Sequence, residues 1–104
     1  MLTQTALECL KIYLLRRIEY AQYQVDGAYH RAEIHNADIL PDGRVTVEFI
    51  IDHTLPGDIT VTKVQLLDRN GAVWAEKDVK ILRRDAQEGI LYRFRFTIGD
   101  QEEG

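Results

Sequence analysis

Three polar side chains close together in the sequence are of the types that bind metal ions. His30, Glu33 and His35 lie in a segment with strand character. Side chains on a strand alternate between its two faces, so His30 points away from Glu33 and His35. A zinc site requires more than the two remaining ligands, and no paired ligand motif follows. We interpret the three as solvated strand residues, and expect no metal and no cofactor.

Asp52 and His53 have the residue types of an acid–base pair, but the chain lacks the nucleophile that such a pair would activate. It contains no serine, and its single cysteine, Cys9, lies in a segment of helical pattern. This excludes Ser-His-Asp schemes and most Cys-His schemes. Asp68–Gly71 has the first oxygen ligands of a calcium loop without the later ones, and is predicted to be a turn. We therefore predict that the protein is not an enzyme.

Composition narrows the possible partners. The chain has 104 residues, 45% apolar and 29% charged, which is typical of one globular domain spanning 1–104. Its net charge of −4 argues against a general affinity for nucleic acid. Arginines do alternate with aromatics near the C-terminus, but strict alternation would bury Tyr92, Phe94 and Phe96, and buried rings cannot stack on bases. We expect no nucleic-acid partner.

Location is inferred from equally simple features. No apolar stretch approaches the roughly 20 residues of a membrane span, so no membrane association is expected. Lys11, Arg16 and Arg17 interrupt the first hydrophobic run, which therefore lacks the form of a signal peptide. The lone Cys9 is predicted to be a small buried residue in a reducing compartment. These features predict a cytoplasmic protein.

Residues 3–19 alone have the period of a helix. Thr5 with Glu8 three residues later matches a capping box. Apolar residues cover well over half of the helix circumference, more than one sheet face can bury. They are Leu7, Cys9, Leu10, Ile12, Tyr13, Leu14, Leu15 and Ile18. We expect the helix to touch two surfaces, its own sheet and a partner, with Ile12, Leu15 and Tyr13 as the interface residues of a homo-oligomer or an obligate complex.

The rest of the chain, 20–98, has the pattern of strands joined by tight turns, followed by an acidic tail at 99–104. Turns are expected at Asp26-Gly27, Leu40–Gly43 and Asp68–Gly71. The expected strands are 20–25, 28–39, 44–52, 59–67, 72–82 and 90–98. No helices alternate with them, so the fold class is mainly β: an antiparallel sandwich or partly open barrel of about six strands with one N-terminal helix over an open end or face.

Within these strands, two positions depart from simple alternation. Residues 59–67 change the face that carries their apolar side chains, which indicates a bulge near Thr62-Lys63 or a strand that passes between sheets. Trp74 is predicted to point inward, because the opposite face of its strand has no bulky residue beyond Val73. The predicted core consists of Leu14, Val47, Phe49, Val64, Leu66, Phe94 and Phe96.

Several segments resemble small proteins from prophage regions of Clostridia that lie among tail and baseplate genes. The segments are Leu15–Ala21, Val61–Gly71 and Gln87–Phe94. The central hairpin is also similar to the N-terminal β-domain of phage tail-collar fibre proteins. The resemblance implies a non-catalytic structural protein, a prophage virion or tail-assembly component whose partners are itself or other virion proteins. The alternatives left open are a small host domain that binds a peptide or sugar, and a small pocket-bearing enzyme.

Overall fold

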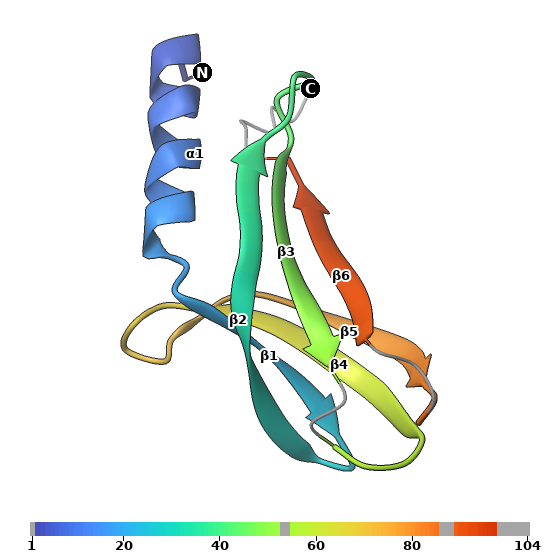
Figure 1. Cartoon of the computed structure of the whole chain (residues 1–104). Helices are drawn as coiled ribbons and strands as arrows, with labels where there is room; N and C mark the ends of the chain where they lie inside the picture. Colours follow the sequence, from blue (N-terminus) through green and yellow to red (C-terminus); the bar gives the residue numbers. More distant parts are fainter. Residues whose placement is uncertain (1, 53–54, 86–88, 98–104) are drawn as a thin grey trace, which may run out of the picture.

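One helix and six strands make up the fold of the protein, which a computed structural model describes for residues 2–52, 55–85 and 89–97 (Figure 1). In chain order the elements are α1 (Gln4–Arg17), β1 (Tyr20–Val25), β2 (Ala28–Ile39), β3 (Val45–Asp52), β4 (Ile59–Leu67), β5 (Val73–Arg83) and β6 (Gly89–Phe96).

All strand pairs are antiparallel, and the strands follow the order β5-β4-β1-β2-β3-β6. The long strand β2 connects the two halves of the sheet. Its first half pairs with β1 and its second half with β3, with a shift in register between Ile34 and Asn36. This irregularity folds the sheet over into a nearly closed, barrel-like form (Figure 1). The predicted fold class, six antiparallel strands with one N-terminal helix, is confirmed.

Bulges account for the irregular patterns in β4 and β5. Opposite β1, the register of β4 shifts so that Gln24 pairs with Lys63 and Val25 with Val61, which leaves Thr62 as the extra residue. The predicted bulge near Thr62 is therefore confirmed. Strand β5 has two further register shifts against β4. At the first of them, Trp74 is the extra residue between Val73 and Ala75.

The hairpin turns adopt the conformations that their sequences favour. Asp26 and Gly27 both have positive φ, at 50° and 80°, as a two-residue hairpin loop between β1 and β2 requires. In the turn before β5, the Gly71 N–H donates to the Asp68 carbonyl at 3.0 Å, and Gly71 has a φ of 81°. That φ belongs to the left-handed region that glycine enters without steric penalty.

The core lies between the two halves of the folded sheet. Val47, Phe49, Val64 and Leu66 have no exposed surface, and Phe94 is also buried, so these five predictions are confirmed. The prediction was wrong for two residues, Phe96 and Leu14, which are only partly buried. Phe96 ends the edge strand β6, and Leu14 belongs to a helix that contacts the body along one side.

Polar side chains cross the outer surfaces of both halves of the sheet. On one half, the Gln22 amide donates to Gln65 at 2.5 Å, and the Gln65 amide donates to Glu76 at 2.8 Å, so three strands are joined. On the other, Glu48 of β3 accepts from Asn36 of β2 at 3.2 Å and from Arg93 of β6 at 2.9 Å. The bonds to Arg93 and then to Asn36 hold the pKa of Glu48 below its usual value.

The N-cap of helix α1 is Thr3, two residues before the predicted cap at Thr5. The Thr3 hydroxyl, and not that of Thr5, accepts one of the free N–H groups of the first turn, that of Ala6, at 3.1 Å. The Glu8 carboxylate instead accepts from the Gln4 side chain at 2.7 Å. A capping box at Thr5 was therefore the wrong prediction, although the helix itself is confirmed. Within the described residues, no helix has the length and apolar character needed to cross a membrane.

Candidate functional site

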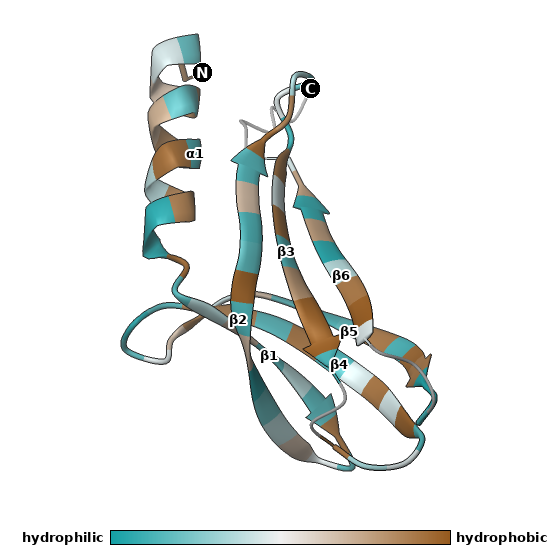
Figure 2. Cartoon of the chain, in the orientation of Figure 1, coloured by the Kyte–Doolittle hydropathy of each residue, from teal (hydrophilic) through white to brown (hydrophobic). Residues whose placement is uncertain are grey.

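An uncovered apolar surface on α1 is the strongest candidate for a functional site. The helix stands beside β2, and one side of it faces away from the sheet (Figure 1). We call Cys9, Leu10, Ile12 and Tyr13 the outer helix face. All four are exposed, Ile12 to 43% and Tyr13 to 54%. Figure 2 shows brown, hydrophobic bands around the middle of this helix.

The predicted interface residues therefore fall on two sides of the helix. Ile12 and Tyr13 lie on the outer helix face, whereas Leu15 is partly buried against the core. The expectation that Cys9 is buried was wrong, because Cys9 is exposed. On an isolated helix, sequence alone does not indicate which side of a wide apolar stripe the sheet will cover.

The inner side of α1 contacts the body of the protein through few residues. Ile18 is buried, and Leu14 and Leu15 pack against the core. One turn earlier, the inward residue is Lys11, which is only 6% exposed and whose ammonium lies 3.5 Å from the Glu8 carboxylate. The Lys11 ammonium also lies beside Gly43, in the turn between β2 and β3. The N-terminal half of the helix is thus held by a charged side chain where an apolar one would be usual.

The C-terminal end of α1 is fixed by a group that we call the Trp74 cluster: Tyr13, Arg17, Asp68 and Trp74. The rings of Tyr13 and Trp74 lie 6.1 Å apart, and the Arg17 guanidinium lies 5.9 Å from the Trp74 ring. Asp68 accepts from the Trp74 indole at 3.0 Å and lies 3.7 Å from Arg17. The indole bond, followed by the backbone N–H of Ala72, holds the pKa of Asp68 below its usual value.

The inward orientation predicted for Trp74 was wrong. As the extra residue of a bulge, Trp74 leaves the alternation of β5 and remains 37% exposed. The inward face of β5 contains Ala75, Val79 and Ile81, which pack against the core. The prediction compared the two faces only near Val73, whereas the bulky inward residues, Val79 and Ile81, occur later in the strand.

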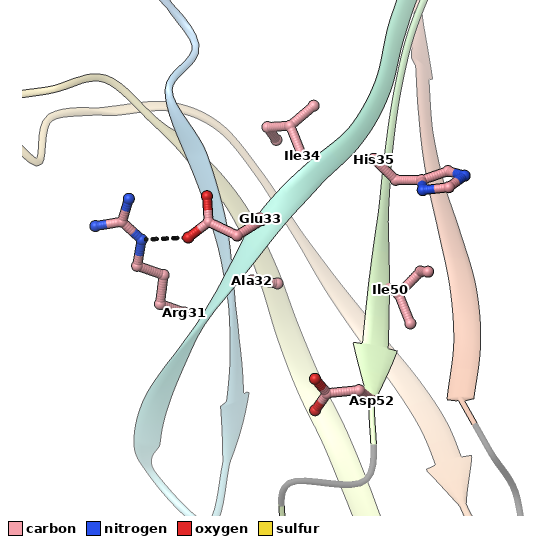
Figure 3. A pocket seen from close by; sticks show the side chains of 7 residues that line it. All are labelled: Arg31, Ala32, Glu33, Ile34, His35, Ile50 and Asp52. Carbon is pink, nitrogen blue, oxygen red and sulfur yellow. Dashed lines mark hydrogen bonds and ion pairs between the residues drawn. The ribbon is translucent and has the colours of Figure 1, made fainter.

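An open hollow of about 320 Å³ lies over β2 and β3 (Figure 3). Figure 3 shows that Glu33 turns toward Arg31, with 3.3 Å between Nε and Oε1, while His35 points away from it. Glu33 and His35 therefore do not converge, and no group of His, Cys, Asp or Glu within the described part of the chain has the arrangement of a metal site. Asp52 also lines the hollow, and His53 is outside the described residues.

A second open hollow, also of about 320 Å³, lies where the end of α1 meets the turn between β4 and β5. Its lining is mainly polar and consists of Arg16, Arg17, Glu19, Arg69 and Asn70. The three guanidinium groups give this end of the helix a positive charge, which Glu19 offsets in part.

The aromatic row of β6 faces the core, as alternation predicts. The Tyr92 ring lies 5.5 Å from Phe49 and 5.3 Å from Phe94, while Arg93 and Arg95 on the other face are exposed. Burial raises the pKa of the Tyr92 hydroxyl. These rings pack in the interior and do not form an exposed stacking platform.

Sequence reasoning missed the structural role of Arg83. It was expected in a polar loop, yet it ends β5 with no exposed surface. Its guanidinium donates to the carbonyls of Asp52 at 3.1 Å, Leu55 at 2.5 Å and Gly57 at 2.8 Å. Arg83 thereby fastens the connection between β3 and β4. The burial of Arg83 could have been predicted from the alternation of side chains from Val79 onward, which places position 83 on the inward face of the strand.

Comparisons of the chain with protein-family models, with curated proteins and with solved structures give no match.

Proposed function

We propose that this is a non-catalytic structural protein that assembles with copies of itself through the outer helix face. The observation that supports the proposal is the exposure of Leu10, Ile12 and Tyr13 on a helix whose opposite side already packs on the body. Several large apolar side chains left exposed on one helix are typical of an interaction site. Covering it with protein would remove the largest apolar side chains of α1 from water.

The charges around Ile12 favour a second copy of the chain as the occupant. Glu8 lies four residues before Ile12 and Arg16 lies four residues after it, so all three share one side of the helix. A twofold axis through Ile12 would pair the helix with an antiparallel copy. Each Glu8, which also accepts from Gln4 and lies 3.5 Å from the Lys11 ammonium, would then face Arg16 of the other copy. The two Ile12 side chains would meet between these pairs. Such self-complementarity is what a twofold-symmetric interface needs.

Sedimentation velocity at micromolar concentration tests the self-association. We expect the parent protein to sediment as a dimer or larger assembly, and Ile12→Glu to sediment as a monomer because it places a charge at the centre of the interface. Leu82→Glu is the matched control, since Leu82 is 50% exposed on β5 and lies outside the outer helix face. A parent protein that is monomeric throughout, or a Leu82→Glu variant that dissociates equally, would contradict the proposal.

For the biological role, the resemblance of Leu15–Ala21 and Val61–Gly71 to proteins from prophage tail regions supports a virion or tail-assembly component. Such a protein is made in the cytoplasm and becomes part of a particle by self-association. The test is to induce the prophage and to analyse purified particles by mass spectrometry. We expect this chain in the particles at a stoichiometry of several copies, and its absence from tails and from tail-assembly intermediates would refute the role.

A further inference from the structure

The free edge of β6 is a second surface with the properties of a binding site. Within the described residues, β6 pairs with β3 alone and ends the sheet. Eight consecutive pairs, from Val45–Phe96 to Asp52–Gly89, join the two strands without any shift in register. Alternate backbone N–H and C=O groups of β6 therefore point away from β3 in a regular row. Such a row is a template for a further strand.

The other edge of the sheet, β5, differs from β6 in the features that prevent strand addition. Two bulges bend β5 against β4. Charges of both signs also alternate along it at Glu76, Lys77, Asp78 and Lys80. Bulges and charges of this kind are the usual protection of an edge strand. Strand β6 has no bulge and no proline, and its charged residues are two arginines on one face, so its edge is the less protected one.

The two faces of β6 indicate which residues an added strand would have. On the inner face, Tyr92 and Phe96 are only partly buried and would be covered further by apolar side chains. On the outer face, Arg93 and Arg95 are both exposed. Arg93 is bound to Glu48, whereas Arg95 makes no hydrogen bond or ion pair among the described residues. A strand with acidic residues facing this side would pair with the arginines.

A second copy of β6 does not fit its own edge. In an antiparallel pair, residues directly opposite each other lie on the same face. A second β6 has no acidic residue to place opposite Arg93 or Arg95 in any register, and the register centred on Arg93 would also set two arginines opposite each other, where like charges are unfavourable. We propose that the β6 edge binds an extended segment of a different protein, one in which apolar and acidic residues alternate, by adding it to the sheet.

The probe for this site is an end-capped octapeptide in which valine and glutamate alternate, with a valine–lysine octapeptide as the matched control. Hydrogen exchange of the ¹⁵N-labelled protein locates the bound peptide. We expect the glutamate peptide to slow exchange at those β6 amides that do not donate to β3, and to leave the β5 amides unchanged. We also expect it to bind at least tenfold more tightly than the lysine peptide.

Charge reversal at Arg95 makes the test specific. Arg95 is exposed, so the fold should tolerate Arg95→Glu. This variant should reverse the preference for the glutamate peptide, so that the lysine peptide binds more tightly. Lys77→Glu, at an exposed position of β5, should leave the preference unchanged. The proposal is overturned if neither peptide protects β6 at millimolar concentration, if β5 is protected instead, or if Arg95→Glu keeps the original preference. None of these outcomes bears on self-association through the outer helix face, which is measured without peptide.

Discussion

The indole N–H of Trp74 donates to the Asp68 carboxylate, with 3.0 Å between Nε1 and Oδ2. The other carboxylate oxygen of Asp68 accepts from the backbone N–H groups of Asn70 at 2.8 Å and Ala72 at 3.0 Å. Arg17 approaches the same carboxylate from the end of α1. One ionised side chain therefore stabilises the turn between β4 and β5, and also holds the helix that carries the outer helix face.

Acid should loosen this end of the helix. The pKa of Asp68 is held below its ordinary value of 3.8. The stabilisation is therefore present above that pH and is lost as pH falls through the lower pKa of the folded protein. Trp74 is the only tryptophan, so its fluorescence reports on the bond directly. We expect an emission change centred below pH 3.8 that precedes global unfolding by circular dichroism. Asp68→Asn should remove this early change, and a midpoint above pH 4 would contradict the assignment.

The packing of β3 and β6 predicts unequal losses for two phenylalanines. Phe49 is completely buried and contacts the rings of Tyr92 and Phe94, so Phe49→Ala should cost about 3–5 kcal/mol in the free energy of unfolding. Phe96 is only partly buried at the end of an edge strand, and Phe96→Ala should cost less than half as much. Urea denaturation measures both. Equal losses would mean that β6 is more deeply buried than the structure shows.

Arg83 should stabilise the connection between β3 and β4. Replacing it with methionine keeps an apolar stem but leaves the carbonyls of Asp52, Leu55 and Gly57 without their donor. We expect Arg83→Met to lower the free energy of unfolding by about 2–4 kcal/mol, because three partly buried carbonyls would lose a charged donor. Lys80→Met, at an exposed position of the same strand, should change it by less than about 0.5 kcal/mol. Similar values for the two variants would refute an anchoring role.

The fold was largely predictable because its signals are local. The alternation of apolar and polar residues over 44–52 predicts the strand that those residues form. In the same way, Asp26-Gly27 predicts the hairpin turn at that position. The bulge at Thr62 was also predictable, because an extra residue moves the apolar side chains of β4 to the other face. The predicted strand end at Ile98 and the acidic tail at 99–104 lie outside the described residues.

The features that sequence reasoning missed depend on contacts between distant segments. The outward orientation of Trp74 follows from a bulge that only the pairing of β5 with β4 reveals. The burial of Lys11 and Arg83 follows from the turn at Gly43 and the carbonyls of Leu55 and Gly57, which are far away in the chain. Likewise, the wide apolar stripe of α1 predicted a partner surface. Only the position of the helix on the sheet shows that Ile12 is exposed while Leu15 packs against the core.

Self-association through α1 is tested most directly by sedimentation equilibrium of four proteins: the parent, Glu8→Arg, Arg16→Glu and the double variant. In the proposed dimer, each single change places like charges opposite each other in two symmetry-related positions. At about 0.5–1 kcal/mol for each position, this should raise the dissociation constant about tenfold. The double variant restores opposite charges across the interface but, like Glu8→Arg, loses the contact of Glu8 with Lys11, so circular dichroism must first show that its helix is intact. It should then return to within about threefold of the parent. The account would be contradicted if the double variant lost as much dimerisation free energy as the two single variants together. A parent that is monomeric at tens of micromolar would also contradict it.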